Sequence, residues 1–240
     1  MGNILKGYLD ERLKKESSPK KKGRETAGPV ITISREVGCN GLILAKLITN
    51  QLNKRKLVND WQVLSKEIFY KSAVELNMQT EHVKRVFKQT DKYTFDEILK
   101  AFSNKSYKSE QKIINTLLEV VRSFAIEGYS IIVGRAGHVI ASDIKNALHV
   151  RLTAPLEYRI ETIQVNNELN REEAISFIKR VEKERIAFRK PIRIDNLRED
   201  LFDLTLNRAS FTNEEIVDII EFTLDKKCVM ENGRAKVQYY

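Results

Sequence analysis

Hydrophobic positions in this chain alternate between short β-branched runs and longer segments with helical spacing. The run at 30–34 ends in a polar turn that contains glycines, and apolar residues then recur at helical intervals over 42–52. Further apolar runs predict strands at 130–133, 147–152 and 201–206. Strands that alternate with helices are typical of a parallel sheet covered on both faces, so the pattern predicts an α/β protein.

Polar residues and glycines mark the ends of the predicted helices. The spacing predicts a helix over 109–128 that begins at Ser109 and ends at Gly128, one over 156–163, one from the capping box of Asn170 and Glu173 to Arg189, and one over 214–224 capped by Thr212. Apolar positions at intervals of three and four over 63–102 predict three more helices in series. We expect these three helices to form a side lobe of the α/β body.

The composition limits the class of protein. The 240 residues are 42% hydrophobic and 31% charged, which fits one domain of about 200 residues plus a tail and excludes disorder throughout. No apolar run approaches the roughly 18 residues needed to cross a bilayer, so we expect no membrane contact and a cytoplasmic protein. Two cysteines, Cys39 and Cys228, provide neither a disulfide framework nor a zinc quartet, and His138 is predicted to be a loop residue.

The positive charge is concentrated at the amino end. The net charge is +9, and residues 1–24 hold eight basic side chains against three acidic ones. We therefore divide the chain into a basic tail over 1–28, a domain over 29–228 and a C-terminal tail over 229–240. The basic tail has no aromatic residue beyond Tyr8, so a surface that stacks nucleic-acid bases is not expected. The sequence does not indicate an oligomeric state.

Glycine-bearing turns follow two of the predicted strands. In a parallel sheet the loops after Ser34, Val133 and Leu152 converge at the carboxyl ends of the strands, where ligands bind. Gly38 and Gly41 open a helix, whose backbone N–H groups and dipole favour a phosphate. The same two glycines fit equally well a tight turn that binds no ligand.

Two pairs of arginines are candidate anion ligands. Arg35 and Arg135 each follow directly on a strand; either one alone also fits a salt bridge with a carboxylate such as Glu36, but the pair favours an anion. Arg185 and Arg189 lie four residues apart on one helix face, from which both reach a single polyphosphate. The alternative for this second pair is a solvated face with ion pairs to neighbouring glutamates.

Several segments together resemble the cytidylate kinase-like family of P-loop nucleoside monophosphate kinases. They are ITISREVGCNGLILAKLI (31–48), YSIIVGRAGHVIA (129–141), LHVRLTAPLEYRIETI (148–163), REEAISFIKRVEKERIAFRK (171–190) and FDLTLNRASFTNEEIVDII (202–220). The resemblance covers roughly residues 30–225, with the segments in the family's order. It implies a three-layer α/β/α fold around a parallel five-stranded sheet, with a helical acceptor lobe over 63–103 and a basic lid over 180–198.

The resemblance also implies an activity and a set of site residues. The activity is transfer of a phosphoryl group from ATP, accompanied by Mg²⁺, to a nucleoside monophosphate such as CMP or a related acceptor, so nucleotides are the expected partners. The implied roles are donor-phosphate binding by Ser34, Arg35, Gly38, Cys39, Asn40 and Gly41, acceptor binding by Arg135, and catalysis by Arg185 and Arg189.

The turn after the first strand departs from the family pattern. A Walker A loop continues with Lys and Ser or Thr, and the family's own variant usually reads GSGGR, whereas Leu42 and Ile43 follow Gly41 here. Ala136 also follows Arg135 where cytidylate kinases carry Asp. A second function therefore stays open, that of a non-catalytic nucleotide-binding protein with a degenerate P-loop.

Overall fold

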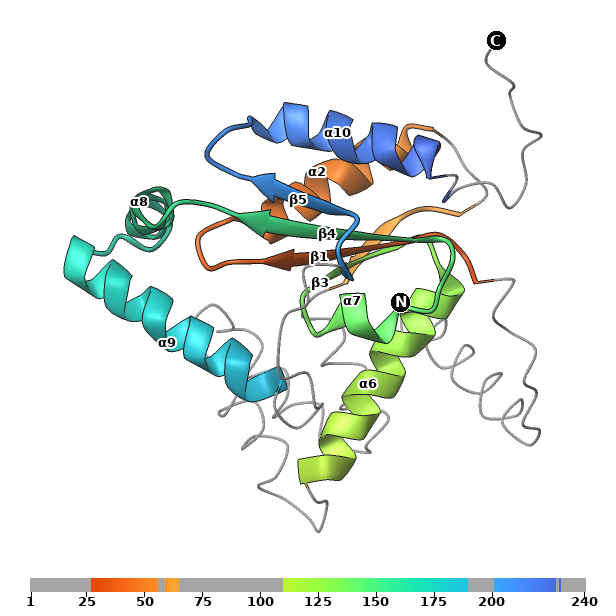
Figure 1. Ribbon diagram of the computed structural model, residues 1–240, viewed down its shortest axis with the longest axis horizontal. Helices are drawn as coiled ribbons and strands as arrows, with labels where there is room; N and C mark the ends of the chain where they lie inside the picture. The colour runs from red at the N-terminus through yellow and green to blue at the C-terminus, as the bar shows by residue number, and fades with distance from the viewer. Residues whose placement is uncertain (1–26, 56–58, 65–109, 190–200, 228, 230–240) are drawn as a thin grey trace, which may run out of the picture.

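A parallel sheet forms the centre of the protein. The computed structural model describes residues 27–55, 59–64, 110–189, 201–227 and 229 (Figure 1). Within these residues the sheet has five strands in the order β2-β3-β1-β4-β5, and every pairing is parallel. The strands are β1 (Val30–Arg35), β2 (Gln62–Leu64), β3 (Ser130–Val133), β4 (Ala147–Thr153) and β5 (Leu204–Asn207). The predicted parallel five-stranded α/β fold is confirmed.

Helices cover both faces of the sheet. The helices α2 (Gly41–Asn53) and α10 (Asn213–Lys226) pack on one face, and α6 (Glu110–Glu127) and α7 (Gly137–Ile140) pack on the other (Figure 1). Ile31 and Ile33 of β1 are fully buried in the core beneath α2 and α10. Thr32, between them, points to the other face and lies beneath α7. Strands buried on both faces explain why the β1 and β3 segments are nearly continuous apolar runs.

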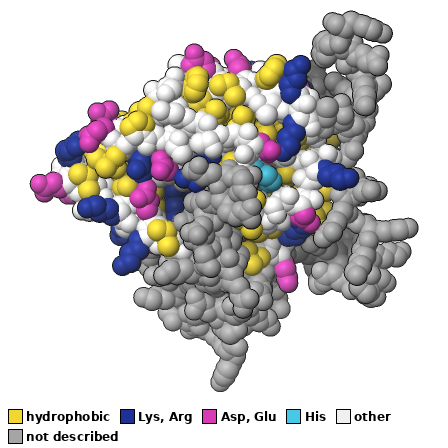
Figure 2. Space-filling view, viewed as in Figure 1, with side chains coloured by type: hydrophobic (Ala, Val, Ile, Leu, Met, Phe, Trp, Pro, Cys, Tyr) yellow, Lys and Arg dark blue, Asp and Glu magenta, His cyan; other side chains and the backbone are white. Residues whose placement is uncertain are grey.

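A helical hairpin lies beyond the carboxyl ends of the central strands. It consists of α8 (Leu156–Asn167) and α9 (Arg171–Arg189), toward which β1 and β4 point (Figure 1). The hairpin has an apolar cluster of its own, made by Val37, Ile160, Ile163, Ala174 and Ile178. Val37 belongs to the turn after β1, so this turn is packed directly against the hairpin. Figure 2 shows basic and acidic side chains interspersed on the solvent face at this end of the molecule.

The predicted helix ends are largely confirmed. Gly128 ends α6 with a φ of 77°, a backbone conformation that glycine adopts without strain. Asn170 and Glu173 form the expected capping box at α9, with reciprocal bonds of 2.9 and 3.0 Å. Thr212 forms a second capping box at the start of α10. Ser109, the predicted cap of α6, lies outside the described residues.

Three predictions from the hydrophobic pattern are wrong. Val63 and Leu64, predicted to begin a helix, belong to strand β2, which is only three residues long. The last strand begins at Leu204 rather than at residue 201. His138 is not a loop residue, because it lies buried in α7 and stacks on the ring of Phe202 with centroids 4.8 Å apart. The rest of the predicted acceptor lobe, at 65–103, lies outside the described residues, as do 190–198 of the predicted lid and most of both tails.

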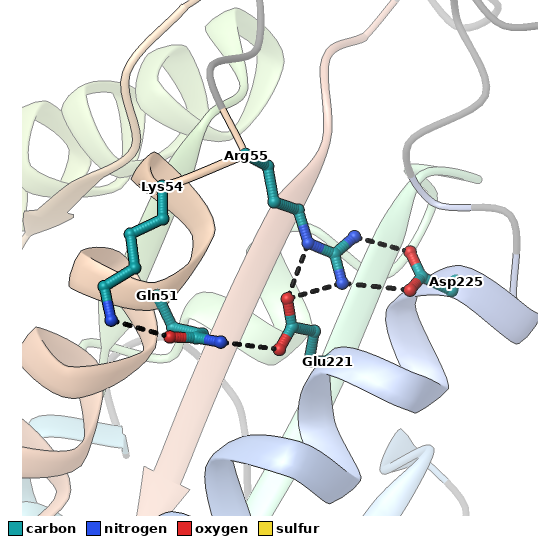
Figure 3. A network of polar contacts seen from close by, with 5 residues as sticks. All are labelled: Gln51, Lys54, Arg55, Glu221 and Asp225. Carbon is teal, nitrogen blue, oxygen red and sulfur yellow. Dashed lines mark hydrogen bonds and ion pairs between the residues drawn. The ribbon is translucent and has the colours of Figure 1, made fainter.

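A polar network joins the carboxyl end of α2 to α10 (Figure 3). The guanidinium group of Arg55 donates to Glu221 Oε1 at 2.6 Å and to both carboxylate oxygens of Asp225 at 2.7 and 2.9 Å. Gln51 Nε2 donates to Glu221 Oε2 at 3.4 Å, and Lys54 Nζ donates to Gln51 at 3.2 Å. This network fixes α2, which follows the glycine-bearing turn, to its neighbour on the sheet.

None of the described helices is long and apolar enough to cross a membrane.

Candidate phosphate-binding site

The turn between β1 and α2 leaves the amino end of a helix without a side-chain cap. Gly38 has a φ of 93° and Asn40 a φ of 48°, and α2 begins at Gly41 with no acidic residue in its first turn. The first backbone bond of the helix runs from the N–H of Leu44 to the carbonyl of Asn40, at 3.2 Å. Uncapped amide groups and the positive end of the helix dipole favour an anion at this position.

The side chains of the turn are used for packing. Cys39 is fully buried in the core beneath α2, and Val37 is buried in the hairpin cluster. Burial, together with the nearby Glu36, raises the pKa of the Cys39 thiol to about 11. The thiol is therefore uncharged at neutral pH. The backbone N–H of Cys39, a predicted phosphate ligand, donates to the carbonyl oxygen of Glu36 within the turn at 3.3 Å.

The two glycines of the turn have different neighbours. A Cβ added at Gly38 would lie 2.8 Å from both the Cα and the carbonyl oxygen of Arg159 in α8, so this glycine permits a close backbone contact with the hairpin. A Cβ added at Gly41 would lie 3.3 Å from Cγ of Arg35, which is tight but leaves a side chain able to shift. Gly41 therefore faces Arg35, and Gly38 faces α8.

Arg35, Arg135 and Arg185 converge at the carboxyl ends of β1 and β3. The guanidinium group of Arg35 lies against Gly134, where an added Cβ would be 2.0 Å from Nη1. Arg185, from α9, donates from Nη1 to the carbonyl oxygen of Arg35 at 2.7 Å. Arg135 directly follows Gly134, so three segments that are far apart in the sequence each contribute one arginine.

The electrostatics agree with this convergence. Burial, and then the charges of Arg185 and Arg135, hold the pKa of Arg35 well below its usual range. Burial and the charge of Arg185 lower the pKa of Arg135 to about 9. Because each cation disfavours the charged form of its neighbours, a bound anion relieves the repulsion among all three. Arg suits a phosphate because its planar fork of donors matches two phosphate oxygens.

The loop after β3 has an unusual backbone. Gly134, Arg135 and Ala136 have consecutive positive φ angles of 76°, 55° and 56°. For a non-glycine residue this conformation costs of order 1–3 kcal/mol, and such residues cluster at functional sites. The loop closes with a bond of 2.9 Å from the N–H of Gly137 to the carbonyl of Gly134, and α7 follows at once.

The structure places most of the predicted site residues at this end of the sheet. Ser34 is half-buried in β1, opposite Arg151 of β4. The predicted alternative for Arg35 is a salt bridge with Glu36, but Glu36 accepts from the N–H of Ala154 at 3.0 Å and lies 3.8 Å from Nε of Arg159. The side chain of Arg189 lies outside the described residues. The roles of these residues in binding stay predictions.

Arg159 is the residue at this site that the sequence did not single out. It lies one turn into α8, and its Nη1 donates to Glu182 Oε1 at 2.5 Å. Its position soon after the carboxyl end of β4 is the only signal in the sequence that could have pointed to it. The alternative for Arg185 and Arg189 is ion pairing with neighbouring glutamates of α9, but one of these glutamates, Glu182, pairs across to Arg159 in α8.

The described residues do not fit a protein-held Mg²⁺. No group of three or more His, Cys, Asp or Glu side chains in the described ranges could hold a metal ion. Leu42 and Ile43 stand after the turn, where a Walker A loop has Lys and a hydroxyl ligand. Glu36 of the turn and Glu182 of α9 are both paired with Arg159.

Comparisons with known proteins agree with this fold. The profile of the cytidylate kinase-like family matches residues 30–210. An uncharacterized protein from Eubacterium ventriosum is 19% identical with a TM-score of 0.58, over 82% of this chain and 98% of its own, and so has the same fold. Shikimate kinase from Bacteroides thetaiotaomicron is 12% identical with a TM-score of 0.44, over 82% of this chain and 98% of its own. No curated protein matches.

Proposed function

Because the chain belongs to the cytidylate kinase-like family, we propose that it binds ATP and transfers the γ-phosphoryl group to a nucleoside monophosphate such as CMP or a related acceptor. The observation that supports this most directly is the convergence of Arg35, Arg135 and Arg185 beside the uncapped amino end of α2. Phosphoryl transfer depends almost entirely on positioning and charge neutralisation, which such a cluster supplies.

Each arginine has a distinct place in the proposed reaction. Arg35 and the backbone N–H groups of Gly38, Asn40 and Gly41 bind the donor phosphates, and Arg135 binds the acceptor phosphate. Arg185 neutralises charge on the phosphoryl group during its transfer between the two phosphates. Arg189 acts together with Arg185. An oxygen of the acceptor phosphate attacks the γ-phosphorus, the bond to the bridging oxygen breaks, and ADP leaves with that electron pair.

Magnesium is given no step in this proposal. When it accompanies ATP it neutralises phosphate charge, and because the described residues contain no group of three or more His, Cys, Asp or Glu side chains for a metal ion, it would be held mainly by the phosphates. Neutralisation is therefore assigned to the three guanidinium groups. Burial and the charge of Arg185 lower the pKa values of both Arg35 and Arg135.

One observation favours a second function, that of a nucleotide-binding protein without turnover. Leu42, half-buried in the first turn of α2, occupies the position of the basic residue in the family's turn. Loss of a phosphate-facing cation lowers transition-state stabilisation more than ground-state binding when that cation acts on the transferring group. A chain of this kind keeps nucleotide affinity but forms little product.

A titration followed by product analysis tests both functions. The chain is titrated calorimetrically with ATP, GTP, CMP, AMP and UMP with and without Mg²⁺, and each ATP–acceptor mixture is then analysed for ADP and the diphosphate product. We expect ATP to bind and CMP or a related monophosphate to be phosphorylated. Binding of ATP without product supports the non-catalytic function.

Variants link the result to the site. Arg135→Ala and Arg185→Ala are expected to lose affinity or rate at least tenfold, on the scale of a lost charge-assisted donor. Arg171→Ala serves as the control, because Arg171 is an exposed arginine of the same helix as Arg185 and pairs only with Glu157 among the described residues. If no nucleotide binds, or if both site variants match the control, the proposed function is wrong.

A further inference from the structure

Arg159 lies where three segments meet: the turn after β1, helix α8 and helix α9. Only 12% of its side chain is exposed. Its Nη1 is 2.5 Å from Glu182 Oε1 in α9, and its Nε is 3.8 Å from Glu36 Oε2 in the turn. Its backbone is also in close contact with Gly38, the glycine whose added Cβ would lie 2.8 Å away. One side chain therefore touches the phosphate turn and the helix that carries Arg185.

Apolar packing holds the same junction together. Val37, the residue between Glu36 and Gly38, is buried with Ile160 and Ile163 of α8 and with two residues of α9. Burying a valine side chain contributes about 1.5–3 kcal/mol. The turn and the hairpin thus form one packed unit, and the ion pairs of Arg159 lie at its edge.

The junction determines where Arg185 lies. Glu182 precedes Arg185 by three residues, so the two side chains lie on the same side of α9. Arg185 reaches the carbonyl oxygen of Arg35 at 2.7 Å. Helix α9 is therefore attached to the end of β1 twice, directly through Arg185 and indirectly through Glu182, Arg159 and Glu36.

A second ion pair between α8 and α9 provides a contrast. Arg171 and Glu157 approach to 2.8 Å, but their side chains are 54% and 63% exposed. Exposed ion pairs of this kind contribute about 0–1 kcal/mol to stability and do little to fix the position of one helix against another. Arg159 differs because it is mostly buried and because one of its partners belongs to the phosphate turn.

We propose that Arg159 is a positioning residue of the phosphate site, which holds α9 against the turn after β1 and so keeps Arg185 beside Arg35. The inference rests on the proposed nucleotide binding, because its effect is measured on a bound phosphate. Arg159 acts through Arg185 and need not touch the nucleotide.

A double-mutant cycle on ATP affinity tests this role. Arg159→Met, which keeps the length of the side chain and removes its charge, is expected to weaken ATP binding about tenfold, within the range of couplings between residues of one network. In an Arg185→Ala background the same substitution is expected to change affinity by less than about twofold, because the residue it positions is gone. Arg159→Lys keeps the pair with Glu182 and is expected to fall between wild type and Arg159→Met.

The matched control is Arg171→Met, which removes the other α8–α9 ion pair and is expected to leave ATP affinity within about twofold of wild type. Thermal melting of all variants separates loss of fold from loss of position, and Arg159→Lys serves if Arg159→Met does not fold. The positioning role is overturned if neither Arg159 variant changes affinity, if the loss persists undiminished without Arg185, or if Arg171→Met reproduces it. If the wild-type protein binds no nucleotide, both the proposed function and this inference are wrong. If the wild-type protein and every Arg159 variant bind ATP equally well, this inference alone is wrong.

Discussion

At the scale of single residues, the site depends on glycines that leave room for arginines. The guanidinium group of Arg35 lies where a side chain at position 134 would be, and the left-handed backbone at Gly134 sets the direction of the loop that carries Arg135. Neither feature involves a ligand-binding side chain at position 134. Removing this space therefore tests the arginine cluster without removing an arginine.

We expect Gly134→Ala to weaken ATP binding several-fold more than its loss of stability explains. The new Cβ would lie 2.0 Å from Arg35 Nη1 and would displace that guanidinium, and the φ of 76° adds strain of about 1–2 kcal/mol. Isothermal titration and thermal melting are measured on the same sample. Gly128→Ala is the control for strain, because Gly128 has a φ of 77°, its added Cβ would lie 2.4 Å from Cα of Gly28, and it belongs to the other end of the sheet. Equal losses of affinity in both variants would show that strain alone is responsible.

Leu42→Arg is expected to tighten ATP binding about tenfold, since a charge-assisted contact contributes about 1.5–3 kcal/mol. Leu42 is half-buried, whereas Gly41, Leu44, Ala45, Ile48 and Leu52 are the buried residues of α2, so the change in melting temperature should be small. Ile43→Arg is the matched control one residue further along, where the side chain is 50% exposed. A clear fall in melting temperature without a gain in affinity would show that Leu42 packs as a core residue and does not face the phosphates.

At the scale of elements, what the sequence predicts depends on the length of the element. The long helices and their caps follow from periodicity and from local residues such as Asn170 and Thr212, whose bonds are made within one turn. Strand β2, with three residues, and α7, with four, are too short to show a period. The pairing of Arg159 with Glu182 spans two helices, so no spacing along the chain indicates it.

The polar network between α2 and α10 leads to a prediction about the stability of the fold. Arg55→Ala removes the bonds to Glu221 and Asp225, and the paired carboxylates raise the pKa of Arg55, with the hydrogen bond to Asp225 contributing most. Because the side chain of Arg55 is 26% exposed, we expect a loss of about 1 kcal/mol, or a fall of about 2–4 °C in melting temperature. Lys54→Ala removes only an exposed bond to Gln51 and should change neither value measurably. Equal denaturation midpoints for the two variants would mean that the network adds no stability.

At the scale of the whole molecule, the central strand β1 carries two polar side chains that contact other parts of the fold. Its carboxyl end holds Arg35, and its middle holds Thr32, whose Oγ1 lies 2.8 Å from Nδ1 of the buried His149 on β4. The order β2-β3-β1-β4-β5, which makes β1 central, cannot be derived from hydrophobic spacing, because spacing separates the buried strands β1, β3 and β4 from the partly exposed edge strands but does not order the buried three. The resemblance to a known family supplied the five-stranded parallel sheet, whereas the site that it implies stays a prediction.

His149 connects β4 to β1 and to Asp203, which precedes β5. Its backbone N–H donates to Asp203 Oδ2 at 2.8 Å, and Lys227, just after α10, pairs with the same carboxylate at 2.5 Å. Burial is the main cause that lowers the pKa of His149 below its usual 6.5, while Asp203 opposes this shift and Lys227 adds to it. The folded chain therefore holds a neutral imidazole between β1 and β4.

We expect the free energy of unfolding to fall as the pH drops below about 6.5, and we expect His149→Gln to flatten that fall. A histidine whose folded pKa is depressed takes up its proton in the unfolded state first, so its stabilising effect is complete above pH 6.5 and is lost as the pH falls toward the folded value. Urea denaturation of both proteins at pH 5.0 to 8.0 measures the effect. Glutamine is uncharged throughout and can still bond to Thr32, so the difference between the two curves isolates the titration of His149. Parallel curves over the whole range would show that other groups cause the acid sensitivity and that the buried imidazole does not contribute to it.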